Sequence, residues 1–340
     1  MRVELCRIAS EWDAYVEAHP QAVNYHRWIW KKLIEDTYGH ETFYLMVRGE
    51  EGIQGVLPLV AIKSWIFGRF LVSVPFFSYG GLLASSAEAR EQLLQGAVKL
   101  ARELGARHIE LRQGTVCEVS WQDTTAKVTM EVTLPEDVAL LWDRLSSGLR
   151  NKVRKAQRCG LRTEWGKSDA VDVFYTLFAK NMRDLGTPVY PRRWFENFFR
   201  LLPNETRILT VWDQAQPVAA GFVTSFRDTL ELPWSASLPN SRKKYSAVLL
   251  YWSLQEWALE NGYRRVDFGR CTPGSGTHEF KRHWGCHEKP LHWYYWLPNG
   301  APVPELRPAN PHFHLAIGLW KHLPIGVANL LGPRIVRAIP

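Results

Sequence analysis

Cysteine is scarce in this sequence, and its spacing follows no known metal or disulfide pattern. The residues are Cys6, Cys117, Cys159, Cys271 and Cys286, and no CxxC pair occurs among them. A disulfide framework and a zinc site held by cysteines are therefore not indicated. The metal-binding motif HExxH is also absent. Scattered, unpaired thiols favour a reducing, cytoplasmic environment.

Several other signatures are missing as well. GxxxxGK[ST] is absent, no GxGxxG follows a strand, and GxSxG does not occur, so a P-loop, dinucleotide binding and a serine hydrolase are not supported. No run reaches the roughly 18 apolar residues that a spanning helix needs. Residues 1–20 lack the apolar core of a signal peptide, so we expect none.

What is present is a globular composition with an excess of cations and tryptophan. Of 340 residues, 46% are hydrophobic and 22% charged, which allows about two domains with sizeable cores. The net charge of +8 favours phosphate-bearing partners such as nucleotides, RNA or anionic lipid without choosing among them. Ordinary solubility charge is the alternative. With sixteen Trp, we expect many to be partly exposed, as on ligand or partner surfaces.

The two halves of the chain repeat one order of elements. Each half predicts a hairpin, a short aromatic strand, a helix ending at a glycine (Gly105 or Gly262) and a further strand. The matching segments are 41–62 and 205–226 for the hairpin, 74–81 and 230–237 for the short strand, and 93–113 and 249–270 for the helix with its following strand. The pattern predicts two copies of one α/β domain.

We place the boundaries at 1–140 for the first domain, 141–297 for the second, and 298–340 for a Pro-rich linker with an amphipathic tail. The second half opens with helical spacing over 140–160 and a basic run that ends at Gly160. Prolines at Pro324 and Pro333 divide the apolar, sparsely cationic tail into short segments. Such a tail could lie on an anionic bilayer surface or pack against its own protein.

Residues 237–250 leave a strand and open a helix. The helix start gathers Arg242, Lys243, Lys244, Tyr245 and Ser246. Free N–H groups, the helix dipole and three cations there favour a phosphate from a donor molecule or from RNA. A solvated basic turn is the alternative interpretation.

Residues 266–285 carry the other candidate site. Asp267 lies in a strand that reads as buried, where a carboxylate needs a partner such as Arg265 or Arg270, so an ion pair and a catalytic role both stay open. Gly274 and Gly276 then allow a sharp turn. The segment FKRHWG brings a lysine back beside aromatic side chains, where it could stabilise negative charge developing on an acyl oxygen.

These segments resemble the FemAB/FemX family, whose members consist of two tandem GNAT-type domains. The run LRNKVRKAQRCG (149–160) is similar to the family's basic helix, and VDFGRCTPGSGTHEFKRHWG (266–285) to its closing strand, glycine turn and Phe-Lys pair. The resemblance implies an α/β (α+β) fold of two acyl-CoA N-acyltransferase-like domains with mixed central sheets flanked by helices. It also implies transfer of an aminoacyl or acyl group to an amine. The tail narrows the resemblance to FemAB-like proteins of exosortase (PEP-CTERM) and exopolysaccharide loci, which implies a small-molecule or lipid-linked acceptor of the cell envelope.

The resemblance leaves the donor open. The family's coiled-coil arm is missing, and the acyl-CoA loop lacks its glycines. Aminoacyl-tRNA, acyl-CoA and acyl-carrier protein all remain candidate cosubstrates, with no permanently bound cofactor expected. The site of the family's functional lysine is Lys281, and the proton acceptor is Asp267 or His278. Further binding residues are expected to be Arg150, Asn151, Arg154, Lys155, Tyr190, Glu231, Trp234, Arg270, Gly276, Phe280 and Trp284.

A hypothesis of another class is a non-catalytic scaffold. Basic residues interleaved with Trp and Tyr suit stacked bases, so such a protein would bind envelope precursors or RNA. For either function we expect a cytoplasmic protein, with peripheral contact at the inner membrane surface left open.

Overall fold

The computed structural model describes residues 1–64, 68–298, 302–303 and 311–339, with the backbone alone for 311–314. Most of the predicted Pro-rich linker lies outside the described residues. The chain forms two compact units. One comprises 1–127, 290–306 and 335–340, and the other comprises 128–289 and 307–334. Strand β7 (Gln122–Thr133) runs from the first unit into the second, and β13 (His287–Trp296) runs from the second into the first.

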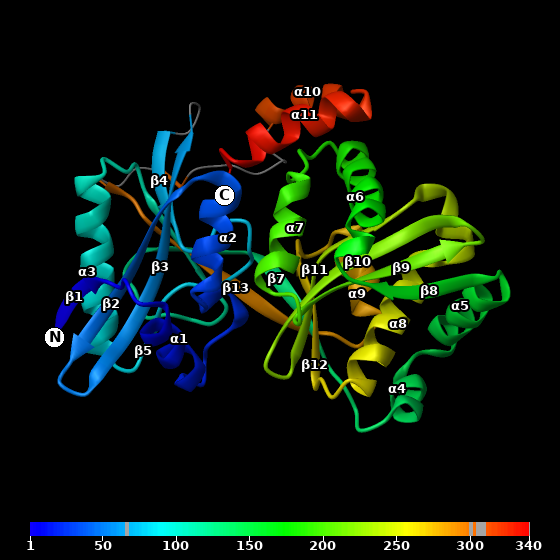
Figure 1. The fold of residues 1–340 in the computed structure, drawn as a ribbon, viewed down its shortest axis with the longest axis horizontal. Helices are drawn as coiled ribbons and strands as arrows, with labels where there is room; N and C mark the ends of the chain where they lie inside the picture. The colour runs from blue at the N-terminus through cyan, green and yellow to red at the C-terminus, as the bar shows by residue number, and fades with distance from the viewer. Residues whose placement is uncertain (65–67, 299–301, 304–310, 340) are drawn as a thin grey trace. The chain divides into compact units, whose positions relative to one another are not determined.

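The first unit is a mixed sheet with the strand order β1-β2-β3-β4-β6-β13 (Figure 1). All neighbours in it are antiparallel except β4 and β6, which are parallel and joined through helix α3. Its elements are β1 (Arg2–Leu5), α1 (Ala9–Ala18), η1 (Asn24–His26), α2 (Ile29–Tyr38), β2 (Glu41–Gly49), β3 (Gly52–Ser64), β4 (Gly68–Val72), β5 (Leu83–Ala84), α3 (Ala87–Glu103) and β6 (Ile109–Gln113).

The second unit repeats this plan with the order β7-β12-β11-β10-β9-β8. Here β11 and β12 are the parallel pair, joined through helix α8. The predicted hairpin, the helix and the strand after it are thus present in both units, whereas the strand before the helix in the first unit is β4 and not residues 74–81. Its elements are α4 (Val138–Arg144), α5 (Ser147–Arg158), β8 (Leu161–Gly166), η2 (Ser168–Ala170), α6 (Val171–Leu185), α7 (Arg192–Leu201), β9 (Thr206–Asp213), β10 (Gln216–Phe226), β11 (Thr229–Ser237), η3 (Pro239–Lys244), α8 (Ser246–Glu260), β12 (Arg265–Cys271), α9 (Gly276–Arg282), α10 (Pro311–Lys321) and α11 (Ile325–Val336).

Three local predictions are wrong. Residues 74–81 form no strand, because Val74 and Phe76 have φ values of 48° and 74°, in the left-handed region that extended chains do not adopt. The single helix expected over 140–160 is two helices, since the Ser146 hydroxyl caps a new one by accepting from the Leu149 N–H. Pro333 lies inside α11 and does not end it.

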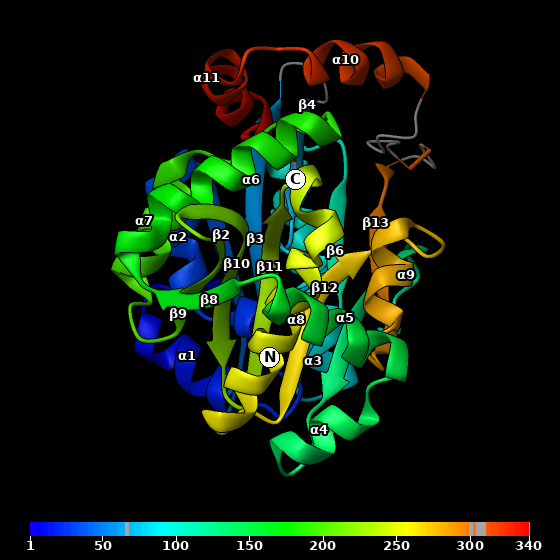
Figure 2. The ribbon, with the colours of Figure 1, turned by 90° about the vertical axis from the view of Figure 1, so that its right-hand side faces the viewer.

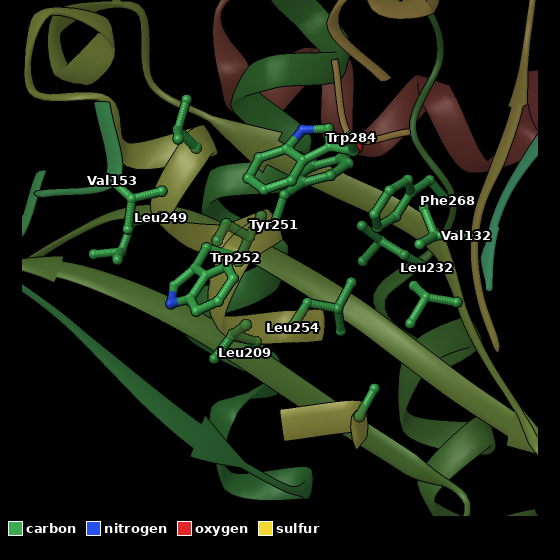
Figure 3. Packing of buried hydrophobic residues seen from close by; sticks show 14 of the residues in the cluster. Val132, Val153, Leu209, Leu232, Leu249, Tyr251, Trp252, Leu254, Phe268 and Trp284 are labelled. Carbon is green, nitrogen blue, oxygen red and sulfur yellow. The ribbon is translucent and has the colours of Figure 1, made fainter. Parts of the chain in front are cut away.

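The core of the second unit has two faces, one on each side of its sheet. Val223 of β10 packs toward α8 in the cluster that Figure 3 shows, which includes Trp252 and Phe268. The preceding residue, Phe222, points to the other face. There its ring contacts Phe195 and Trp234, with centroids 5.2 and 5.6 Å away, under helices α6 and α7. Of the described tryptophans, Trp12, Trp30, Trp194, Trp234, Trp252 and Trp284 are buried and the other nine are partly exposed, as predicted.

Candidate active site

The two parallel strands of the second unit pair only briefly. Their register joins Thr229 to Arg265, Leu230 to Val266 and Glu231 to Asp267. Beyond that rung β11 continues beside β10 to Ser237, while β12 continues beside β7. The point at which two parallel strands separate places main-chain groups of both at the carboxyl end of the sheet, which is where α/β folds bind ligands.

A β-bulge marks the separation. The register of β12 with β7 shifts between Asp267 and Arg270, and Gly269 has φ of 74°. An added Cβ at Gly269 would lie 3.2 Å from the Leu232 carbonyl oxygen. Asp267, which is 2% exposed, stabilises the bulge: its Oδ1 accepts from the Gly269 N–H at 2.7 Å and from the Thr129 hydroxyl at 2.6 Å. The positive φ and the close carbonyl oxygen therefore require glycine at position 269. Such bulges often lie next to active sites.

Lys281 of α9 reaches this bulge from the side. Its Nζ donates to the carbonyl oxygens of Gly269 at 2.8 Å and Arg270 at 3.3 Å, and its side chain is buried. Burial lowers the pKa of Lys281, while Cys271 and Asp267 act to raise it. An ammonium group has three N–H donors, and these two carbonyls account for two of them. The structure thus brings Lys281 and Asp267 to the same turn of backbone.

The lowered pKa predicts how stability depends on alkaline pH. The buried cation is disfavoured in the folded state, so the unfolded chain binds more protons between the folded pKa and the unfolded value of about 10.4. Raising pH through that window should therefore stabilise the wild type relative to Lys281→Met, by at most about 1.4 kcal/mol per pH unit. Guanidinium unfolding of both proteins from pH 7 to 10 measures the difference. A difference that stays flat or falls with pH would contradict the burial argument.

His278 makes a hydrogen bond at one ring nitrogen and lies near a carboxylate at the other. Nδ1 accepts from the Gly274 N–H at 3.2 Å, whereas Nε2 lies 3.1 Å from a Glu288 carboxylate oxygen without a hydrogen bond to it. Its backbone N–H donates to the Ser275 hydroxyl, which caps α9. These contacts hold the ring of His278 against the glycine turn, so the residue has a structural role at this turn.

Two predicted binding aromatics pack in the core beside this turn. Phe280 and Trp284 contact the ring of Tyr251, with centroids 4.9 and 5.9 Å away. Trp284 is buried, and Gly276 is the first residue of α9. Burial raises the pKa of the neighbouring Cys286 thiol to about 12, so it stays protonated at neutral pH. A protonated thiol is a poor nucleophile, which argues against Cys286 as a covalent nucleophile.

The predicted phosphate site lies at the start of α8, directly after β11. Tyr245 has φ of 60° and turns the chain from η3 into the helix, where the buried Ser246 hydroxyl lies 2.7 Å from that of Ser241. Arg242 and Lys243 are exposed, whereas Lys244 pairs with Asp213 at 2.6 Å. Two of the three predicted cations are thus directed to solvent near the helix N-terminus.

The basic helix α5 meets this loop through one residue. Lys155 places its ammonium 5.2 Å from the centre of the Tyr245 ring. Arg150 instead contacts Asp143 at 3.3 Å, and the Arg154 guanidinium lies over Trp142 of α4. Asn151 is exposed. The structure therefore brings Lys155 to the loop and gives Arg150 and Arg154 partners on the preceding helix.

The residues predicted to line an acceptor channel also come together in part. Tyr190 and Trp234 are ring neighbours at 5.6 Å within the aromatic cluster under α6 and α7. Glu231 is buried and directly opposite Asp267 in the ladder. Register extends this polar row across the sheet in the order Thr206, Thr224, Glu231, Asp267, Glu131.

Sequence reasoning missed the threonines of this row, and also Gly269, Thr129 and Glu288. They belong to strands far apart in the chain or differ from their neighbours only in backbone geometry. A glycine in the strand pattern was the one available signal, since it is typical of a bulge.

Comparisons with known proteins place the fold. A model of the acetyltransferase (GNAT) domain matches residues 143–282, which include the α5, α8 and α9 segments described above. The crystal structure of FemX is similar over 87% of this chain and 98% of its own, with a TM-score of 0.65 and 15% identity. A tandem GNAT protein from the clavulanic acid biosynthesis pathway is similar over 89% and 100%, with a TM-score of 0.55 and 13% identity. The C-terminal domain of a putative lysylphosphatidylglycerol synthetase from Agrobacterium fabrum is similar over 84% and 91%, with a TM-score of 0.56 and 12% identity.

No curated protein matches the chain. The class that the fold defines is nevertheless plain: it is the tandem GNAT-type acyltransferase fold, with mixed sheets flanked by helices. The second of its two units carries the matched GNAT domain.

Proposed function

We propose that this protein is an N-acyltransferase that moves an acyl or aminoacyl group from an activated ester or thioester to an amine. The observation that carries the proposal is the buried Lys281 ammonium at the bulge where β11 and β12 separate, within the residues that match the GNAT domain. A fixed cation in a water-poor environment stabilises negative charge far more than one in solvent does.

In the proposed reaction the neutral amine attacks the acyl carbonyl carbon directly. The carbonyl π electrons move to oxygen, and Lys281 stabilises that oxyanion by donating a hydrogen bond. The C–O or C–S bond to the donor then breaks, releasing an alkoxide or thiolate as the amide forms. The nitrogen loses its proton to Asp267 or His278, both of which lie at the same turn as Lys281.

The donor is proposed to bind at the α8 N-terminus. A phosphate there would meet the first N–H groups of the helix and the exposed Arg242 and Lys243. GNAT acyltransferases use acyl-CoA, which makes it the first donor to test; aminoacyl-tRNA and acyl-carrier protein also carry phosphates. For the acceptor we propose an amine of a cell-envelope or exopolysaccharide-related molecule, on the resemblance of the tail to FemAB-like proteins of those loci.

The test is product formation. Purified protein is incubated with acyl-CoA, acyl-carrier protein or charged tRNA together with amine acceptors, and acylated product is sought by mass spectrometry. Product that forms after RNase treatment would identify a thioester donor, and loss of product with RNase would identify tRNA. Saturable binding of RNA or precursor with no product from any donor would overturn the proposal in favour of a scaffold.

Charge removal at the donor loop should weaken donor binding. We expect Arg242→Ala with Lys243→Ala to raise the KM for the donor about tenfold with kcat nearly unchanged, because exposed cations bind ground state and transition state alike. Lys99→Ala, an exposed lysine on α3, is the matched control. An unchanged KM in the double variant would show that the phosphates bind elsewhere.

A further inference from the structure

Helices α10 and α11 carry an apolar surface that faces away from their own unit. Figure 2 shows both helices beside α6. The residues that contact this part of the second unit are small or point toward it. Ile317 lies against Gly186, and Arg183 donates to the Leu323 carbonyl oxygen at 3.1 Å. In α11 the buried positions are Ala328 and Gly332, four residues apart, with Gly332 against Val189.

The opposite side of each helix should be polar, but it is not. In α10, Leu315 and Leu319 are 76% and 64% exposed and share one face. In α11, Leu330 is 63% exposed, with Val327 and Leu331 beside it at the spacing that normally faces a protein core. Single exposed leucines are ordinary, whereas exposed apolar side chains repeated at helical spacing on two successive helices mark an interaction surface. We call these five residues the α10–α11 apolar face.

The charges near this face have one sign. Arg334 is exposed on the side of α11 that carries Leu330, Lys321 is exposed at the end of α10 with its Cε beside Gly186, and the sequence from 306 to 340 contains no Asp or Glu. Apolar side chains flanked by cations, on helices too short to cross a membrane, are the features of a segment that lies in an anionic lipid interface. No helix among the described residues is long and apolar enough to span a bilayer.

We propose that the α10–α11 apolar face binds the surface of an anionic lipid bilayer, with Leu315, Leu319 and Leu330 inserted among the acyl chains and Arg334 at the phosphate level. Both contributions are needed, because apolar insertion supplies the affinity and the cation supplies the preference for anionic lipid. This inference stands independently of the transferase proposal. If both hold, a lipid-linked acceptor would be presented to an enzyme already located at its membrane.

The experiment is cosedimentation of the full chain with vesicles of phosphatidylcholine alone or mixed with phosphatidylglycerol. We expect binding to the anionic vesicles, weakened by salt, and little binding to the neutral ones. Leu315→Ser with Leu319→Ser and Leu330→Ser should weaken binding at least tenfold. Arg334→Glu should weaken it at least fivefold, at roughly fivefold for the cation removed and more for the added acid. Leu140→Ser, at an exposed leucine of α4, is the matched control.

Three outcomes would overturn the proposal. The wild type might not sediment with anionic vesicles, or the triple serine variant might sediment as the wild type does. Alternatively, the wild type might be a dimer by light scattering that the triple variant converts to monomer, with vesicle binding unchanged; the face would then join two copies of the chain. None of these outcomes depends on acyl transfer, so the proposal fails or survives separately from the enzymatic one.

Discussion

Lys281→Met is expected to reduce kcat/KM for acyl transfer by about 10²–10³-fold, the usual effect of removing one donor to a developing oxyanion. Methionine keeps the length and apolar stem of lysine but cannot donate a hydrogen bond. The loss should lie mainly in kcat, since the interaction strengthens as charge develops on the acyl oxygen. Steady-state kinetics with the donor identified by mass spectrometry measures both constants.

The same lysine holds the bulge, so stability must be measured alongside. Without its donor the carbonyl groups of Gly269 and Arg270 lose a partner, which should cost about 1–3 kcal/mol of unfolding free energy. Lys180→Met, at an exposed position of α6, controls for the substitution itself. Full activity in a folded Lys281→Met protein would remove Lys281 from the mechanism, and a fall in kcat/KM caused only by KM would assign it to binding.

A second large effect is expected in the first unit, at a buried ion pair on β6. Arg112 Nε lies 2.6 Å from Glu110 Oε1, Nη1 donates to the Phe77 carbonyl oxygen at 2.7 Å, and the guanidinium is 4.4 Å from the Trp293 ring centre. Both side chains are almost fully buried. Arg112→Met should therefore cost about 3–5 kcal/mol, because it leaves the Glu110 carboxylate buried without its cation. Guanidinium unfolding followed by tryptophan fluorescence gives the difference.

A double variant measures the interaction between Glu110 and Arg112 apart from the contribution of each side chain. Glu110→Leu with Arg112→Met removes both charges, so most of the loss should be recovered, apart from about 1 kcal/mol for the Phe77 carbonyl. Arg102→Met, at an exposed cation of α3 near Trp296, should change stability by less than about 0.5 kcal/mol. If the double variant lost as much unfolding free energy as the two single variants together, the two charges would not stabilise each other.

The buried pair illustrates what a sequence pattern does not show. Glu110 and Arg112 are two residues apart in a strand, which predicts a shared face but not which face is buried. The strand itself was predicted, because helix 93–104, the glycine after it and the apolar run that follows form a strong local signal. Burial of the pair depends on Phe77 and Trp293, residues from loops and strands that no local pattern connects to β6.

The candidate site divides in the same way. Lys281, Asp267 and the glycine turn were predicted as one segment, since fewer than twenty residues contain them. The domain boundary near residue 140 was placed by helix spacing, whereas the compact units in the structure change at Lys127 and again in β13. The proposed domains and the observed units differ because strands β7 and β13 are distant in sequence from the sheets they complete.

By itself the sequence determined the order of elements in each half, the repeat, the basic helix start and the lysine after the glycine turn, because all are local patterns of polarity and backbone preference. Only the tertiary structure decided that β11 and β12 separate after Glu231 and Asp267, that a bulge at Gly269 accepts the Lys281 ammonium, and that α10 and α11 turn their leucines outward. These features depend on register and on which faces are covered, and both are set by packing between residues far apart in the chain.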